Sequence, residues 1–152
     1  TNQTLRGTVS GASGITGSCA GAGPEVHYWW RSCPGDPGGR FRATTCDANT
    51  SYDTVLYMRH GESTADACND DNLGCTNFAR TSQIVSFVPS NWGLHVLSVD
   101  TYSGAGGNYV LYTFYPEIII TDRRAPAPAP KSPPRFDLRR GVCLPPLRLV
   151  NG

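Results

Sequence analysis

Apolar and polar residues alternate along seven short segments of the chain, and Gly, Pro, Asn, Asp or Ser cluster between them. Alternation with a period of two is typical of strands that bury one face. In the segment Val26-His-Tyr-Trp-Trp30, for example, successive side chains would lie on opposite faces of a sheet. The expected strands are Thr4–Val9, Val26–Arg31, Arg40–Thr45, Thr54–Arg59, Gln83–Val88, Leu94–Asp100 and Asn108–Tyr115, with Glu117–Thr121 extending the last.

The composition also favours strands. The chain has 17 Gly and 12 Pro but a single Met, which disfavours long helices, and Tyr, Thr, Val, Phe and Trp dominate the alternating segments. At 152 residues it is long enough for one domain with one core. Short strands at this spacing, without crossover helices between them, predict an antiparallel β-sandwich of about seven or eight strands.

The distribution of charge and proline divides the chain near residue 121. Residues 1–121 carry six Arg and ten acidic residues, whereas residues 122–152 carry seven basic residues, two acidic residues and seven of the 12 prolines. We therefore predict a sandwich domain over residues 1–121 and an extended Pro/Arg-rich tail over residues 122–152. The tail lacks the interleaved aromatic residues that stack on bases, so no nucleic acid is expected as a partner. No apolar run approaches the length of about 18 residues that a membrane span needs.

The six cysteines indicate a disulfide framework and an oxidising compartment. The chain starts at Thr1 without Met, which is consistent with a removed signal peptide and with a secreted or cell-surface protein. Six cysteines allow about 15 connectivities, so the pairing stays open. The pairing that we favour joins Cys68 to Cys75 across a short loop, Cys19 to Cys46 beside adjacent strands, and Cys33 to Cys143, which would hold the tail against the body.

One short motif offers an enzymatic interpretation. The segment Arg59-His-Gly-Glu-Ser63 directly follows an apolar strand and resembles the signature of the histidine phosphatases. That resemblance implies His60 as a nucleophile that takes up phosphate, Arg59 as a clamp for the phosphoryl oxygens, and His95 as the second His of the pocket. The rest of that family's pattern is absent, because strands and turns surround the motif where helices and strands should alternate. We therefore expect no catalysis.

A longer series of motifs, collinear over about residues 4–115, indicates a different family. The most distinctive pair is Tyr52-Asp-Thr-Val-Leu-Tyr57 and Cys68-Asn-Asp-Asp71, and both resemble segments of bacterial pre-peptidase C-terminal (PPC) domains. The other segments that resemble these domains are Gly17–Tyr28, Gly39–Cys46, Thr81–Ile84, Leu94–Asp100 and Gly107–Leu111. The resemblance implies a jelly-roll-like β-sandwich of the kind often appended to secreted enzymes. Related modules of collagenases bind collagen and calcium.

Three acidic residues are candidate ligands for calcium. In such a fold Asp53, Asp70 and Asp71 would converge on one rim, with Asn69, Asn72 and loop carbonyls supplying further oxygens. Calcium takes about six to eight oxygen ligands, largely from carboxylates and carbonyls. The alternative is that these Asp and Asn residues shape tight turns through hydrogen bonds to the backbone. The Asp-x-Asp spacing of an EF-hand is absent.

Contacts with a partner are expected at an outward Trp and in the tail. The adjacent Trp29 and Trp30 must face opposite sides of a regular strand, and we expect Trp30 to be the exposed contact. The tail end, residues 142–150, is apolar and extended, so it would add along an exposed sheet edge. In cis it would cover that edge, and in trans it would build a head-to-tail filament. The contact residues expected there are Leu144, Leu147 and Leu149.

These observations predict a non-catalytic secreted β-sandwich module for extracellular binding or assembly, such as the self-associating subunit of a surface fibre. Its expected partners are further copies of the chain, another extracellular protein or a glycan. A histidine-phosphatase-like enzyme and a calcium-dependent carbohydrate- or collagen-binding module are the alternatives. Calcium is the one cofactor expected.

Overall fold

The computed structural model describes residues 2–32, 38–61, 67–75, 80–88, 93–115 and 148–150. Within these ranges the chain forms strands and no helix. The strands are β1 (Gln3–Val9), β2 (Glu25–Ser32), β3 (Gly39–Thr44), β4 (Thr54–His60), β5 (Ala67–Asn69), β6 (Gln83–Val88), β7 (Gly93–Thr101), β8 (Gly107–Phe114) and β9 (Arg148–Val150). The features predicted from sequence that lie outside the described residues are the extension Glu117–Thr121, the domain boundary near residue 121, Cys33, Cys143, Leu144 and Leu147.

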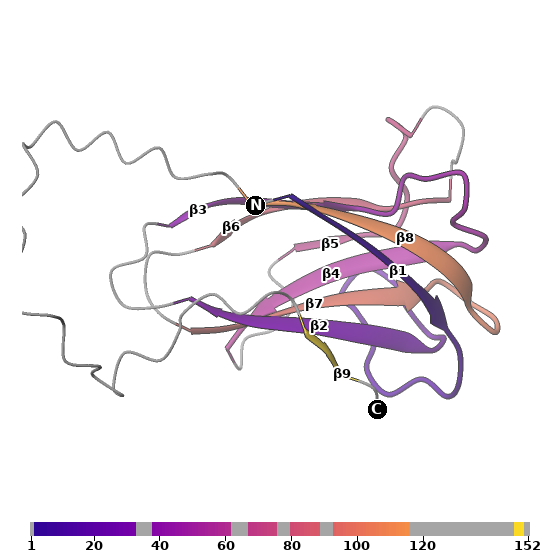
Figure 1. Ribbon diagram of the computed structural model, residues 1–152. Helices are drawn as coiled ribbons and strands as arrows, with labels where there is room; N and C mark the ends of the chain where they lie inside the picture. Colours follow the sequence, from indigo (N-terminus) through magenta and orange to yellow (C-terminus); the bar gives the residue numbers. More distant parts are fainter. Residues whose placement is uncertain are drawn as a thin grey trace, which may run out of the picture.

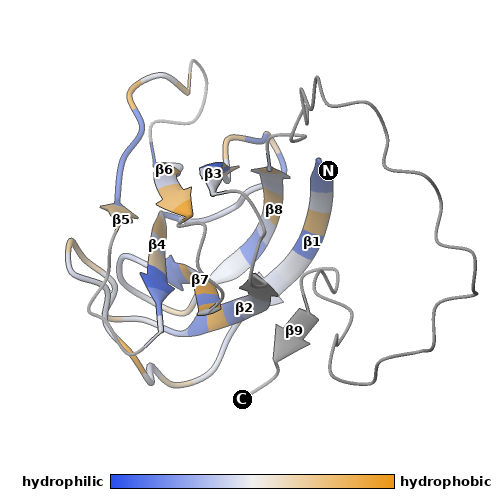
Figure 2. Cartoon of the chain, turned by 90° about the vertical axis from the view of Figure 1, so that its left-hand side faces the viewer, coloured by the Kyte–Doolittle hydropathy of each residue, from blue (hydrophilic) through white to orange (hydrophobic). Residues whose placement is uncertain are grey.

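The strands form two sheets that lie one above the other (Figure 1). One sheet has the order β1-β8-β3-β6 and the other the order β5-β4-β7-β2-β9. Seen along the strands, the sheets stack as two layers (Figure 2). Every strand pair is antiparallel, so the predicted antiparallel β-sandwich is confirmed.

The core lies between the layers and takes alternate residues from most of the longer strands. The sheet that contains β1 contributes Val9, Phe41, Ala43, Ile84, Val88, Tyr109 and Leu111. The sheet that contains β4 contributes Tyr28, Trp30, Leu56, Met58, Leu97 and Val99. None of these side chains is more than 4% exposed, so the period-two alternation of the sequence does identify the buried face.

Strand β4 departs from simple alternation because both of its faces are covered. Its first five residues, Thr54 to Met58, are all buried. The loop between β1 and β2 covers the outer face, where the Tyr57 hydroxyl donates to the carbonyl of Ile15 at 3.3 Å. The amides of Gly14 and Ile15 in turn donate to the Glu25 carboxylate at 2.9 and 2.7 Å, which holds this loop against β2.

Two strands were not among those predicted. Strand β5 pairs with β4 but has only three residues, too few for a periodic signal. Strand β9 comes from the tail end and pairs antiparallel with the outer edge of β2, in the same chain, with Leu149 opposite Tyr28. Tail residues 148–150 therefore lie in cis along a sheet edge, one of the two arrangements expected for this segment.

Two of the disulfide bonds favoured from sequence, Cys68–Cys75 and Cys19–Cys46, are wrong. The four described cysteines do form disulfides, but Cys19 bonds to Cys68 and Cys46 bonds to Cys75. The physical reason is the sheet order, because Cys68 lies on the edge strand β5, at the same sheet edge that the loop carrying Cys19 reaches. The loop after β5 then carries Cys75 back toward the end of β3, where Asn72 Nδ2 lies 3.6 Å from Cys46 Sγ.

The choice between the two adjacent tryptophans is also wrong. Trp30 faces the core, is 4% exposed, and packs at a centroid distance of 4.9 Å against Phe41 of the opposite sheet. Trp29 is the residue that faces outward, on the far side of β2, and it is half-buried. Alternation requires that the two side chains face opposite ways, but the facing sheet decides which one is inside.

Candidate metal site

Antiparallel pairing of β4 with β5 brings three acidic residues together. Asp53 comes directly before β4, and Asp70 and Asp71 come directly after β5. The register places Leu56 opposite Asn69, so the start of β4 and the end of β5 meet at the same end of the sheet. The convergence that the sequence predicted for Asp53, Asp70 and Asp71 is therefore a direct result of the register.

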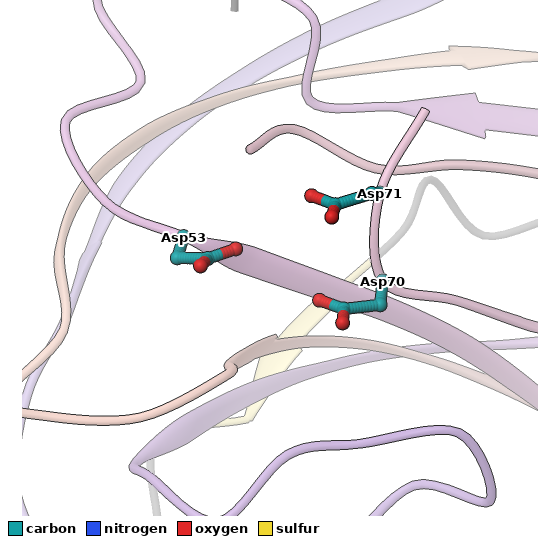
Figure 3. A group of neighbouring side chains, drawn as sticks. All are labelled: Asp53, Asp70 and Asp71. Carbon is teal, nitrogen blue, oxygen red and sulfur yellow. The ribbon is translucent and has the colours of Figure 1, made fainter. Parts of the chain in front are cut away.

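The three carboxylates point toward one another (Figure 3). Each offers one oxygen, and these oxygens all lie within 4.8 Å of one another. Asp53 and Asp70 are half-buried, whereas Asp71 is exposed. The cluster therefore opens to solvent on the side of Asp71, which gives an ion a path of entry.

A group of buried hydroxyls holds the two segments that carry the three aspartates in place. Thr45 Oγ1 and Thr54 Oγ1 share a hydrogen bond of 2.7 Å, and Ser82 Oγ lies 3.0 Å from Thr54 Oγ1. Ser82 Oγ also donates to the backbone carbonyl of Asp70 at 2.5 Å. These hydroxyls fix the loop after β5 to the start of β4. No sequence motif indicated them, because Ser and Thr are common in strands and only the fold brings these three segments together.

The two Asn residues beside the cluster serve the loop backbone. Asn69 Oδ1 accepts from the amide of Gln83 at 2.9 Å, and Asn69 Nδ2 donates to the carbonyl of Asp71 at 3.1 Å. Asn72 Oδ1 accepts from the amide of Gly74 at 3.1 Å. Both Asn side chains thus shape the turn, which was the alternative interpretation for them.

The electrostatics of the cluster are unfavourable without a cation. Burial, followed by the nearby charge of Asp71, raises the pKa of Asp53, and Arg80 offsets this only in part. Burial, followed by the charges of Asp71 and Asp53, raises the pKa of Asp70. In the described part of the chain, Asp53 Oδ1 and Asp70 Oδ1 are buried and have no hydrogen-bond partner. Two buried carboxylate oxygens that lack a donor fit a bound cation well.

The Arg-His-Gly motif does not form a phosphate site in this fold. Arg59 and His60 are consecutive on β4 and therefore face opposite ways. The Arg59 guanidinium lies on the outer face, where Nη2 donates to the carbonyl of Thr16 at 3.0 Å. On the core side, His60 Nδ1 lies 2.5 Å from Nδ1 of His95. The two groups that a phosphatase would need on one phosphate are separated by the sheet itself.

Comparison with known proteins gives a likeness in fold. No family model matches the chain, and no curated protein matches its sequence. The sandwich is similar to the crystal structure of the pre-peptidase C-terminal domain of collagenase from Bacillus anthracis. The two share 12% sequence identity with a TM-score of 0.49, over 74% of this chain and 89% of that domain. That collagenase domain is of the type that the sequence motifs resemble.

Two further features of the structure concern the setting in which the protein works. The two disulfides fit an oxidising compartment. The described part of the chain contains no helix with the length and apolarity that a membrane crossing requires.

Proposed function

We propose that the chain is a non-catalytic, calcium-binding β-sandwich module of an extracellular protein. The observation that carries this proposal is the cluster of Asp53, Asp70 and Asp71, whose oxygens lie within 4.8 Å of one another. Three carboxylates this close repel one another, and two of them hold buried oxygens that have no donor among the described residues. A divalent cation would remove both costs at once.

The chemistry of the donors favours calcium among the divalent ions. All three side chains are carboxylates, which are hard oxygen ligands, and no His or Cys belongs to this cluster. Transition metals such as zinc prefer sites with His or Cys ligands. Magnesium demands near-ideal octahedral geometry and usually takes only one or two carboxylates. Calcium accepts irregular shells, and Asp53, Asp70 and Asp71 would hold it with water completing the shell.

We propose no catalysis because β4 separates the residues of the phosphatase-like motif. Arg59 and His60 project from opposite faces of β4, so the motif that suggested an enzyme is split between an outer surface and the core side. The function that remains is binding.

Calorimetric titration with calcium and thermal unfolding test this site together. We expect the native protein to bind calcium and to gain about 2.7 kcal/mol of stability when calcium is 100-fold above its Kd. Asp70→Asn should remove most of this gain. Without calcium the same variant should be at least as stable as the native protein, because it relieves repulsion. Calcium affinity should also fall as pH is lowered, since protons compete for carboxylates with raised pKa values.

A matched control is Asp47→Asn, which removes an acidic residue outside the cluster. Asp47 accepts a hydrogen bond from the Tyr112 hydroxyl and belongs to the loop after β3. This variant should keep the full response to calcium. The opposite result has two parts: the native protein binds no calcium at millimolar concentration, and Asp70→Asn is less stable than the native protein. That result would show that the aspartates only shape the turn.

A second role, self-assembly, is favoured by the position of β9. Three tail residues pair with the outer edge of β2 through backbone hydrogen bonds, and such a strand can be exchanged between copies of a chain. In trans the pairing is head-to-tail and would build the filament expected of a surface fibre or adhesive protein. Deletion of residues 122–152 should then abolish association seen by light scattering.

A further inference from the structure

A pocket of about 570 Å³ lies on the outer face of the sheet that contains β4, β7 and β2. Arg59 and Gly61 line it at one end of β4, whereas Asp53 precedes the other end of that strand. A strand of this length separates the two sites by about 20 Å. The pocket is therefore distinct from the acidic cluster, and its volume falls in the range of small-molecule sites, about 300–1,000 Å³.

The floor of the pocket is a row of three residues across three strands. Trp29 of β2 lies opposite Val96 of β7, and Val96 lies opposite Arg59 of β4. Neighbouring strands are about 4.8 Å apart, so Trp29 and Arg59 are about 10 Å apart with an apolar residue between them. Leu94 and Ile15 add further apolar surface at the rim. The row presents an aromatic group at one end and a guanidinium at the other.

The polar groups next to this row already bond to one another. His27 Nδ1 and Ser98 Oγ form a hydrogen bond of 2.8 Å, and His27 Nε2 lies 3.7 Å from the Glu25 carboxylate. Glu25 also accepts the amides of Gly14 and Ile15. Burial lowers the pKa of His27, which favours the neutral ring. A ligand would therefore find few hydrogen-bonding groups free on this side, which disfavours a sugar.

Arg59 is the polar group of the pocket whose hydrogen-bonding capacity is not fully used by the described residues. Its Nη2 donates to the carbonyl of Thr16, its guanidinium lies 5.3 Å from the centre of the Tyr57 ring, and its Nε is buried without a hydrogen-bond partner among the described residues. In the described part of the chain no carboxylate lies within 4.0 Å of this guanidinium. A cation at the wall of an apolar pocket, with no counter-ion among the described residues, is complementary to an anion.

We propose that this pocket binds small organic anions that combine an apolar body with one carboxylate or sulfonate group. The anionic group pairs with Arg59, and the apolar body lies over Val96 against Trp29. The Arg59 guanidinium and an apolar floor match one negative charge on an otherwise apolar molecule.

Two fluorescent probes with a shared apolar body test the proposal on the full chain. They are 1-anilino-8-naphthalenesulfonate and its neutral counterpart N-phenyl-1-naphthylamine, which lacks the sulfonate. We expect the anionic probe to bind about tenfold more tightly than the neutral one, because a hydrogen bond to a charged group contributes that much. Arg59→Gln should weaken the anionic probe about tenfold and change the neutral probe less than about twofold.

The matched control is Arg42→Gln on the outer face of the other sheet, where the Arg42 guanidinium also lies over an aromatic ring, 5.2 Å from the centre of Phe114. It should leave both probes unchanged. Equal binding of the two probes, equal loss in both arginine variants, or no loss in Arg59→Gln would overturn the proposal.

A second variant covers the case in which Arg59→Gln does not fold, since Arg59 also holds the β1–β2 loop. Leu94 is 44% exposed at the rim, so Leu94→Glu should fold as the native chain does, by near-UV circular dichroism. The new carboxylate would compete for Arg59, and the anionic probe should bind at least about fivefold more weakly. Unchanged binding of the anionic probe in folded Leu94→Glu would overturn the proposal by itself.

Discussion

Asp100 is fully buried beneath the loop that precedes β2. The amide of Thr101 donates to its Oδ1 at 2.6 Å, but Oδ2 has no hydrogen-bond partner among the described residues. Burial, offset in part by the Thr101 amide and reinforced by the charge of Glu25, raises the pKa of Asp100 to about 7. Such a carboxyl group makes stability fall as the pH rises from about 4 to about 7, because the folded state binds the extra proton.

Asp100→Asn should remove this dependence on pH. At pH 8 the variant should be more stable than the native protein by about 1–3 kcal/mol, and the difference should vanish below about pH 3, where the native carboxyl is protonated in both states. Urea unfolding at a series of pH values measures the difference. Asp47→Asn should behave oppositely and lose stability at neutral pH, because the Tyr112 hydroxyl and nearby amides lower the pKa of Asp47. A constant difference between native and Asp100→Asn at all pH values would contradict the assignment.

At the scale of single residues, the sequence predicts contacts that follow from strand pairing and misses those that depend on the facing layer. Asp53, Asp70 and Asp71 flank two strands that pair, so the sequence could place them together. Trp29 and Trp30 show the limit, since alternation defines two faces but only the opposite sheet selects the buried one. The orphaned Nε of Arg59 could not be foreseen, because it depends on where the β1–β2 loop crosses β4.

At the scale of elements, the turn between β7 and β8 depends on two glycines that differ in their surroundings. Gly104 and Gly106 both have positive φ, 94° and 80°. A Cβ on Gly104 would meet open space, but a Cβ on Gly106 would lie 2.2 Å from the backbone carbonyl oxygen of Val9 at the end of β1. The same backbone strain is thus present at both positions, with a steric clash at only one.

Gly106→Ala should therefore cost clearly more than Gly104→Ala. We expect a loss of about 1–2 kcal/mol for Gly104→Ala from strain alone, and about 2 kcal/mol more for Gly106→Ala, because the turn or the end of β1 must move. Urea unfolding of the two variants measures the difference. Equal losses would mean that the turn does not approach Val9 as closely as this packing requires.

The elements also show why the sequence could not assign the disulfides. Cys68 and Cys75 are near in sequence, which favoured a local bond, but β5 points Cys68 toward the loop that carries Cys19. The order of strands within a sheet decides such contacts, and that order is set by non-local pairing rather than by local periodicity. The seven longer strands were predictable because each carries enough residues to show alternation.

At the scale of the whole molecule, the core that the described residues form is built without strand β9. Every residue of the core cluster lies between Val9 and Leu111, in β2, β3, β4, β6, β7, β8 or the last residue of β1. Strand β9 contributes three residues at one edge and pairs only with β2. Strand β9 thus covers an edge and adds nothing to the described core, so we expect the sandwich to fold without its pairing.

We consider a chain without residues 122–152 that also carries Cys33→Ser, because the deletion removes Cys143, the partner predicted for Cys33. This chain should still unfold cooperatively and should be only slightly less stable than the intact protein. Hydrogen exchange should become faster at the β2 amides that face β9, around Tyr28, and should stay slow in β7. A peptide of residues 144–152, added to the truncated chain, should restore protection at β2. A chain that fails to fold after this deletion would show that the tail does belong to the core.

The same peptide also decides whether the tail can assemble copies of the chain. In the intact protein the connecting residues 116–147 hold β9 near its own β2 at an effective concentration of order millimolar, so pairing in cis should dominate in dilute solution. Association in trans should appear only as protein concentration approaches that value, or where copies are crowded on a surface, and light scattering measures it. Two results together would contradict the filament: the peptide binds the truncated chain only weakly, and the intact and truncated chains associate to the same extent. Strand β9 would then only cover its own sheet edge in cis.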